Sequence, residues 1–265
     1  MSRRLFAALA AFFCAAPFLW LVLTALRPEA ELTRLGPPSH LSSTAFVRVI
    51  REQPLPRAML NGFLVSACTT VLAIALGSLA AFSLARLRPP GRSVILAGAL
   101  AVSMFPPIAT VGPLYELLSR LGLLDHWAGL VLPYTTFALP LAIFLLTRAF
   151  EDIPEELFRA ARVDGCSPLS ALVRVHLPLA APSIATAALL VFIAAWNELL
   201  YALTFLSTPE RRTAPVAIAM LSSEHAEPWG EIAAASTLAT LPLVVLALIF
   251  QRRIVSGLTA GAVKG

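Results

Sequence analysis

The chain has 265 residues, of which 58% are hydrophobic and only 13% are charged, and its formal net charge is +5. Soluble domains carry about 25% charged residues, so this composition excludes an ordinary soluble protein and indicates that lipid is the main solvent. The arginines are scattered around long apolar runs, which membrane topology explains better than binding to nucleic acid.

Six long apolar runs follow one another along the chain, each with about 20 residues or more, enough to cross a hydrocarbon core of about 30 Å. Because backbone groups in lipid must bond internally, the runs are predicted to be helices. The fifth run continues apolar beyond Glu198 to Leu206. We therefore predict an all-α integral membrane protein with six transmembrane helices in a single domain, residues 1–265. The predicted spans are residues 5–26, 59–85, 93–115, 127–147, 182–206 and 232–251.

The distribution of basic residues predicts the orientation of these spans. Twelve Lys and Arg residues fall on the side that holds both termini, and eight fall on the other side. Because cytoplasmic loops carry an excess of Lys and Arg, both termini are predicted to be cytoplasmic. Arg48, Arg51 and Arg57 lie on the minority side and make this bias modest.

Prolines interrupt the third and fourth spans. Pro106, Pro107 and Pro113 lie in the third span, and Pro133 and Pro140 lie in the fourth. Broken membrane helices are tolerated where protein or a water-filled cavity surrounds the freed backbone groups. Spans three to five are therefore predicted to form the walls of a transport path.

The cytoplasmic loop 150–182 is polar and carries two helical patterns. Glu155 lies where the first helix dipole favours negative charge. Leu157, Ala160 and Ala161 recur at helical spacing and form a small apolar face that another surface can approach closely. Two patterned helices are more than a simple connection needs, so the loop is predicted to dock a partner, with an ordinary surface-lying loop as the alternative.

Local signals predict where these two helices meet. Gly165 can end the first helix in a left-handed conformation, and Asp164 can bond nearby backbone N–H groups. Ser167 and Pro168 then supply the cap and the first turn of a second helix.

Glu198 is predicted to lie inside the bilayer, where an acidic residue indicates function by default. It is predicted to line a path or contact a partner subunit, with structural pairing as an alternative. A proton relay is disfavoured because no second buried acid or histidine accompanies it. Glu116, at the end of the third span, is expected to be solvated.

The later part of the fifth apolar run combines polar and aromatic side chains. Asn197, Tyr201 and Phe205 are expected to share one helical face, at positions i, i+4 and i+8. Amides and hydroxyls bond sugar hydroxyls, and aromatic rings pack against sugar C–H faces. Polar residues also hold membrane helices together, and that alternative stays open.

Other residue types exclude several chemistries. The only lysine is Lys264 and no G-x-x-x-x-G-K motif exists, so the chain is not predicted to be a P-loop ATPase. The cysteines and histidines have no metal-ligand or redox spacing, and no metal site is predicted. Each histidine is expected at a surface or boundary: His40, His126, His176 and His225.

Several motifs, in order and over nearly the whole chain, resemble permease subunits of binding-protein-dependent ABC importers. Ala160-Ala161-x-x-Asp164-Gly165, followed by Leu177-Pro178-Leu179-x-x-Pro182, resembles the "EAA" loop of that family. Trp196-Asn197-Glu198, Phe105-Pro106-Pro107 and the tail 257–265 resemble its carbohydrate branch, and within it the second permease of maltose- and trehalose-type systems. Arg159 stands where the motif usually has Glu, with Glu155 or Glu156 as candidates to compensate.

The resemblance implies a type I ABC importer permease fold, with residues 150–182 as a cytoplasmic coupling-helix loop. It implies ATPase-coupling roles for one set of residues: Glu155, Arg159, Ala160, Ala161, Asp164 and Gly165. The predicted substrate path comprises a second set: Phe105, Tyr134, Phe137, Trp196, Asn197, Glu198 and Tyr201.

The implied function is ATP-driven import of a di- or oligosaccharide such as trehalose or maltose, across the cytoplasmic membrane of a prokaryote. The expected partners are a second permease in a heterodimer, two copies of an ABC ATPase that bind ATP and Mg²⁺, and an extracytoplasmic sugar-binding protein. No nucleic acid, no enzymatic activity and no cofactor in this chain are expected. The alternatives are another substrate of the family, such as glycerol-3-phosphate, an ion-coupled secondary carrier, and a scaffold that transports nothing.

Overall fold

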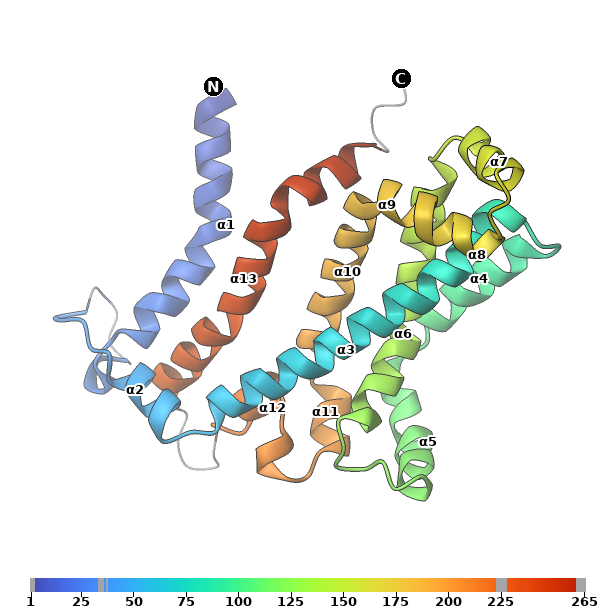
Figure 1. Ribbon diagram of the computed structural model, residues 1–265. Helices are drawn as coiled ribbons and strands as arrows, with labels where there is room; N and C mark the ends of the chain where they lie inside the picture. The colour runs from blue at the N-terminus through green and yellow to red at the C-terminus, as the bar shows by residue number, and fades with distance from the viewer. Residues whose placement is uncertain (1–2, 33–35, 37, 223–227, 261–265) are drawn as a thin grey trace. The chain divides into compact units, whose positions relative to one another are not determined.

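A computed structural model describes residues 3–32, 36, 38–222 and 228–260, and these residues form helices and turns without a strand (Figure 1). The chain forms two compact units, 1–61 with 208–244 and 62–207 with 245–265, and each is described by itself. The single domain over 1–265 stays a prediction. Arg34, His225 and residues 261–265 of the tail motif lie outside the described residues.

Four helices are long and apolar enough to cross a membrane: α1 (Arg3–Ala25), α3 (Leu55–Phe82, continued by η2 Ser83–Leu87), α6 (Ala128–Glu151) and α13 (Trp229–Ala260). Two bent pairs also qualify when each is taken together. These are α4 (Arg92–Ser103) with α5 (Pro107–Arg120), bent by 90°, and Pro168–Leu179 with α10 (Ala181–Trp196), bent by 84°. The described residues therefore give four to six spans where the sequence predicted six.

The proline prediction is confirmed for Pro106 and Pro107 in the third span, but it is wrong for Pro113, which lies within α5, and for the fourth span. α4 ends at Ser103 and α5 begins at Pro107, because Pro106 is extended, with φ −63° and ψ 121°, and the residue before a proline avoids the helical region. Pro133 and Pro140 instead lie buried within α6, which continues unbroken from Ala128 to Glu151. Tight tertiary packing allows a membrane helix to accommodate a missing backbone N–H.

The fifth span is broken at a place that no proline marks. α10 ends at Trp196, and α11 (Leu200–Phe205) begins after three intervening residues. Asn197 therefore lies outside both helices, and the expectation that Asn197, Tyr201 and Phe205 share one continuous helical face is wrong.

In the first unit, α2 (Thr44–Arg51) and α12 (Ala214–Ala219) join parts of α1, α3 and α13. Their small core is mostly alanine: Ala25, Val49, Leu55, Ala58, Ala217, Ala233, Ala234 and Ala235. The Asn61 amide donates to the carbonyls of Glu210 (2.8 Å) and Arg212 (3.0 Å), which ties α3 to the segment before α12.

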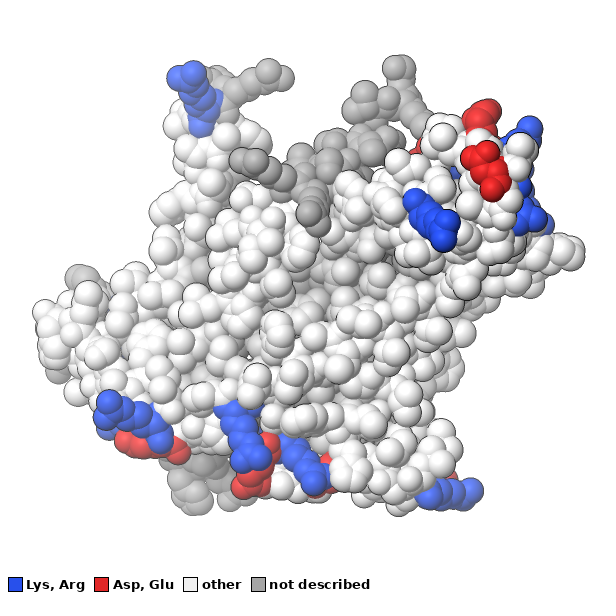
Figure 2. All heavy atoms as spheres, viewed as in Figure 1, with Lys and Arg blue, Asp and Glu red and all other residues white. Residues whose placement is uncertain are grey.

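In the second unit, α6 is the central helix and packs against α4 and α10. A Cβ at Gly77 of α3 would lie 3.0 Å from the Ala142 Cβ of α6, so these two helices approach closely there. At one end of α6 lie the short helices α7 (Glu155–Val163), α8 (Pro168–Ala171), η3 (Leu172–His176) and α9 (Leu177–Leu179). Figure 2 shows acidic and basic side chains gathered over α7 and α8, at the end of this unit.

Candidate functional site

The first candidate site is the coupling loop, residues 150–182, and its first helix ends as the sequence predicted. Gly165 has φ +83°, in the left-handed region. The Gly165 N–H donates to the Arg162 carbonyl (3.2 Å), and the Cys166 N–H donates to the Ala161 carbonyl (2.9 Å). These two bonds form a Schellman motif, which fixes the direction in which the chain leaves α7.

The second helix of the loop also begins as predicted. The Ser167 hydroxyl accepts a hydrogen bond from the Ser170 N–H (3.2 Å), and Pro168 occupies the first helical turn. α8 then continues into the π-helical turn η3, where the Leu177 N–H donates to the Leu172 carbonyl. Single π-helical turns are rare and are frequent at functional sites.

The prediction that Leu157, Ala160 and Ala161 share one apolar face is wrong, because the apolar residues of α7 divide between two faces. Phe158 packs against the core of the second unit, and Ala161 is buried with it. Leu157 (42% exposed) and Ala160 face outward, and so does Val163, which is 87% exposed. The surface available to a partner therefore includes Val163, which precedes the polar Asp164-Gly165 turn. Sequence reasoning predicted the turn but missed Val163.

An ion pair replaces the expected pairing at Arg159. Its guanidinium donates to the Glu155 carboxylate (2.8 Å), and Glu155 also pairs with Arg88 (3.3 Å). The hydrogen bond from Arg159, with its charge and that of Arg88, lowers the pKa of the Glu155 carboxyl. Of the two candidates Glu155 and Glu156, Glu155 is the one that pairs with Arg159, and its compensation for the altered motif stays a prediction. Side chains this exposed contribute little to stability.

Arg86 ties the loop to the end of α3. Its guanidinium donates to the carbonyls of Phe150 and Ile153, at the point where α6 ends and the loop begins. The last carbonyls of a helix have no partner within it, so Arg86 satisfies groups that would otherwise need water. Arg92 adds an ion pair to Glu151 nearby.

His176 contradicts the expectation of a surface or boundary position, because it is completely buried. Three phenylalanine rings surround it edge to face, with centroids at 4.9 Å (Phe82), 5.8 Å (Phe158) and 6.1 Å (Phe150). The sequence pattern missed this role because a single histidine carries no signal of which side of a short helix it occupies.

The second candidate site is the path cavity, a space of about 230 Å³ in the second unit. Five of the seven predicted path residues line it: Phe105, Tyr134, Phe137, Glu198 and Tyr201. Trp196 does not line this cavity. It is 3% exposed and stacks on Phe192, with ring centroids 5.9 Å apart. Asn197 lies outside the cavity too, and its amide donates to the Ile193 carbonyl (2.8 Å) at the end of α10.

Glu198 holds the break between α10 and α11. Its carboxylate accepts hydrogen bonds from the backbone N–H groups of Tyr201 (2.9 Å) and Ala202 (3.2 Å), and from the Tyr134 hydroxyl. The first N–H groups of a helix lack partners within it, and a carboxylate is favoured at that end. Glu198 thus caps α11 and lines the cavity. By contrast, Glu116 is exposed and pairs with Arg120, as a solvated end residue should.

Tyr201 joins the two broken spans. Its hydroxyl is 2.6 Å from the Thr110 hydroxyl and 3.3 Å from the Pro107 carbonyl, both on α5. Its ring stacks on Phe137 of α6, with centroids 5.6 Å apart and an interplanar angle of 20°. α5, α6 and α11 are therefore held together around the cavity, and Thr110 is a contributor that sequence reasoning missed.

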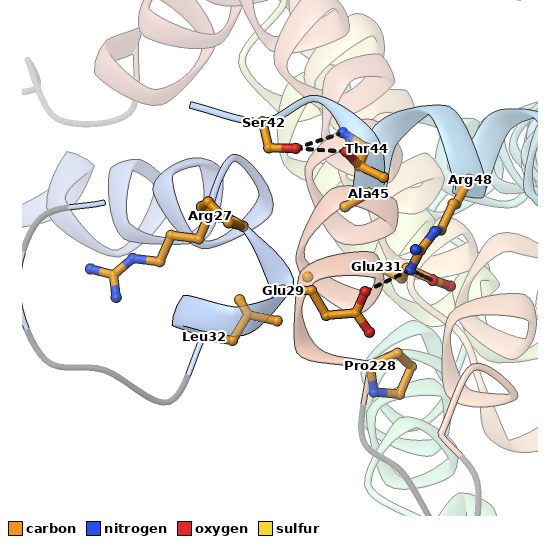
Figure 3. Close-up of a pocket in the computed structure, with 11 residues that line it drawn as sticks. Arg27, Glu29, Leu32, Ser42, Thr44, Ala45, Arg48, Pro228 and Glu231 are labelled. Atoms are coloured by element: carbon orange, nitrogen blue, oxygen red, sulfur yellow. Dashed lines mark hydrogen bonds and ion pairs between the residues drawn. The ribbon is translucent and has the colours of Figure 1, made fainter. Parts of the chain in front are cut away.

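Another hollow, of about 240 Å³, lies in the first unit (Figure 3). Arg48 pairs there with Glu29 (3.0 Å) and Glu231 (3.5 Å), while the Arg27 side chain points away from the hollow. Arg48, which lines this hollow, lies on the side that the distribution of basic residues predicts to be exoplasmic, and that orientation stays a prediction. Among the described residues, no group of three or more His, Cys, Asp or Glu side chains is arranged to hold a metal ion.

Comparison with known proteins identifies the class. Residues 73–260 match the family described as binding-protein-dependent transport system inner membrane component. The chain is 46% identical over 253 residues to the trehalose transport system permease protein of Mycobacterium tuberculosis, covering 94% of this chain and 92% of that protein. It is 40% identical over 265 residues to the trehalose/maltose transport system permease protein of Thermococcus litoralis, covering 98% and 95%.

The fold agrees with this match. A chain from a bacterial ABC transporter involved in the import of the acidic polysaccharide alginate superposes with a TM-score of 0.77 at 22% identity, covering 95% of this chain and 98% of that chain. The family match, together with several helices apolar enough to cross a membrane, shows a multi-pass membrane component of a transport system. The chain belongs to the family of binding-protein-dependent transport system inner membrane components, and it is an ABC importer permease rather than an enzyme.

Proposed function

We propose that the chain is one of two permease subunits of an ATP-driven importer for a neutral di- or oligosaccharide such as trehalose or maltose. The path cavity supports this proposal most directly. It offers the aromatic rings of Phe137 and Tyr201 to the C–H face of a sugar, and the carboxylate of Glu198 to its hydroxyls. The names of two relatives include trehalose, which supports the same substrate class.

The cavity argues for a second permease. Ligand sites usually enclose about 300–1,000 Å³. At about 230 Å³, the cavity would hold only part of a disaccharide, and a related subunit facing it would supply the rest. The residues that line it include Glu198 but no Lys or Arg. A phosphate-bearing substrate such as glycerol-3-phosphate would require such a cation, so this alternative is less well supported.

The remaining functions of the importer, ATP binding and substrate delivery, are assigned to partner subunits. The coupling loop docks one of two ATPase subunits, which bind ATP and Mg²⁺, and Leu157, Ala160 and Val163 form the apolar part of that contact. A sugar-binding protein delivers the substrate on the exoplasmic side, and both termini of this chain lie in the cytoplasm. Docking of the sugar-binding protein on the exoplasmic side is transmitted to the coupling loop by rigid-body movement of the helices.

Reconstitution in liposomes tests the proposal. The chain alone is expected to move no sugar, under either ATP or an imposed proton gradient. With the second permease, the ATPase pair and the binding protein, it is expected to accumulate radiolabelled trehalose or maltose on ATP. Gradient-driven uptake by the chain alone would overturn the proposal and favour a secondary carrier, with Glu198 as the first residue to test.

A further inference from the structure

His176 occupies the point where the coupling loop meets the spans. Phe82 comes from the end of α3, Phe150 from the end of α6 and Phe158 from α7, and their rings enclose the imidazole of η3. We call these four residues the histidine cage. Four segments that are separate in the sequence thus share one buried contact.

The imidazole makes one hydrogen bond and leaves its other nitrogen bare. Nδ1 lies 3.2 Å from the Ala171 carbonyl, which accepts only from a protonated nitrogen. In the neutral ring the single proton therefore resides on Nδ1, and Nε2 carries a lone pair. Nε2 is buried and has no hydrogen-bond partner among the described residues.

The charges around the cage disfavour a second proton. The three phenylalanines contributed by α3, α6 and α7 do not titrate, and the cation whose charge acts on the ring is Arg86 of η2, which binds the Phe150 and Ile153 carbonyls. On α7, Glu155 and Arg159 pair with each other at the surface. Arg174, on the same turn as His176, is exposed.

Protonation would therefore strain this contact. A proton on Nε2 creates a buried N–H without an acceptor, and it adds positive charge near the Arg86 guanidinium. Burying a polar group without a partner is costly, and burying an unpaired charge is costlier still. The imidazolium can be accommodated only if the cage opens toward water.

We propose that neutral His176 is a positioning residue, which fixes the coupling loop to the cytoplasmic ends of α3 and α6 and thereby transmits movement between the spans and the ATPase. The proposal rests on the proposed function, in which this loop docks an ATPase. The cage favours the neutral ring. The contribution of His176 to holding the coupling loop in place is therefore fully present above the ordinary histidine range, near pH 6.5, and is lost as the cytoplasmic pH falls below that range.

The test uses the complete reconstituted importer with the cytoplasmic face exposed to buffers from pH 5.5 to 8. The ratio of ATPase rate with liganded binding protein to basal ATPase rate is measured at each pH, so the ATPase's own pH dependence cancels. In the wild type this ratio is expected to fall several-fold below about pH 6.5.

Two isosteric variants separate positioning from general packing. His176→Asn places an amide N–H near the position of Nδ1, can donate to the Ala171 carbonyl and does not titrate, so it should keep the stimulation and flatten its pH profile. His176→Gln places its amide near Nε2 and should lose stimulation at every pH. Identical pH profiles for the wild type and the Asn variant would overturn the proposal, and so would a Gln variant with normal stimulation.

Two further measurements keep the test decisive. Hydrogen–deuterium exchange of wild-type residues 155–179, corrected for intrinsic rates, should show faster exchange at pH 5.5 than at pH 7.5, and equal protection contradicts the proposal even if a variant fails to assemble. A photo-crosslinking amino acid at the exposed Val163 should capture the ATPase. Absence of that adduct refutes loop docking itself, whereas an adduct together with pH-independent coupling refutes only the role of His176.

Discussion

The coupling loop and the path cavity each depend on one ionisable residue in an apolar setting, but they use it differently. Glu198 accepts three hydrogen bonds, from two backbone N–H groups and the Tyr134 hydroxyl. His176 makes one, to the Ala171 carbonyl, and is otherwise held by aromatic packing. Three directional bonds fix the geometry of the break in the fifth span, whereas His176 has a single one, and our proposal is that its packing responds to a change in charge.

The two regions also differ in what surrounds them. The loop is bordered by exposed ion pairs, such as Arg88 with Glu155, whose contributions salt and water weaken. The path cavity is bordered by hydrogen bonds in apolar surroundings, such as that between Thr110 and Tyr201. Removing a hydrogen bond at the cavity should therefore have a larger effect than removing an exposed ion pair at the loop surface.

The largest effect is expected from Glu198→Ala. This change leaves the Tyr134 hydroxyl and the N–H groups of Tyr201 and Ala202 without their acceptor, and each buried unsatisfied group costs about 1–3 kcal/mol. Loss of folded protein from the membrane fraction and loss of uptake are expected together. Glu198→Gln keeps one acceptor oxygen and should be intermediate. Normal amounts and normal uptake for the Ala variant would show that the cap is dispensable.

Gly165→Pro is expected to abolish transport while leaving the protein inserted. Proline is confined to φ near −65° and lacks the N–H that bonds to the Arg162 carbonyl, so the Schellman motif cannot form. Membrane amount, copurification of the ATPase and sugar uptake are measured in parallel. Gly165→Asn is the matched control, because asparagine tolerates the left-handed region and nothing lies within 4 Å of a new Cβ. Uptake at the wild-type rate by the Pro variant contradicts docking.

Tyr201→Phe is expected to lower uptake several-fold with little change in assembly. It removes the hydroxyl that bonds to Thr110 and Pro107 but keeps the ring that stacks on Phe137, and one buried hydrogen bond typically contributes about 0.5–1.5 kcal/mol. Thr110→Val should give a similar loss. The double variant should be no worse than Tyr201→Phe alone, because both substitutions remove the same bond between Thr110 and Tyr201. Fully additive losses would mean that the two residues act separately.

The smallest effect is expected from Arg159→Ala, which removes an exposed partner of Glu155. Uptake should change by less than about twofold, since exposed ion pairs contribute little. Arg159 lowers the pKa of Glu155, so the pair keeps its charge above the ordinary glutamate range and loses it only as the pH falls through that lowered value. Uptake measured between pH 6 and 8 should therefore depend on pH in the same way in the wild type and in the Arg159→Ala variant. A large loss would place Arg159 in the ATPase contact.

Three local features, two in the coupling loop and one at the end of α4, illustrate how much a sequence can predict. Gly165 is left-handed, Ser167 caps α8 and α4 ends before Pro106, each as expected. Their conformations depend on backbone sterics and on hydrogen bonds a few residues away, and such local physics is encoded in short stretches of sequence.

Other residues could not be predicted in this way. Pro140 looks like a break and lies within a continuous α6, whereas the break after Trp196 has no proline. The polar pair Asn197-Glu198 was its only local sign. His176 looks like a surface residue and is buried, because Phe82 and Phe150, distant in the sequence, meet around it.

The sequence by itself determined the class of this protein, the approximate positions of its apolar helices and the local geometry of the coupling loop, because hydrophobicity, helix caps and turn residues act over short distances. Only the tertiary structure decided which span breaks without a proline, which carboxylate caps the break and which histidine is enclosed. Those outcomes depend on contacts between α3, α5, α6 and α11, and the free energy of such contacts is set by side chains that no local pattern brings together.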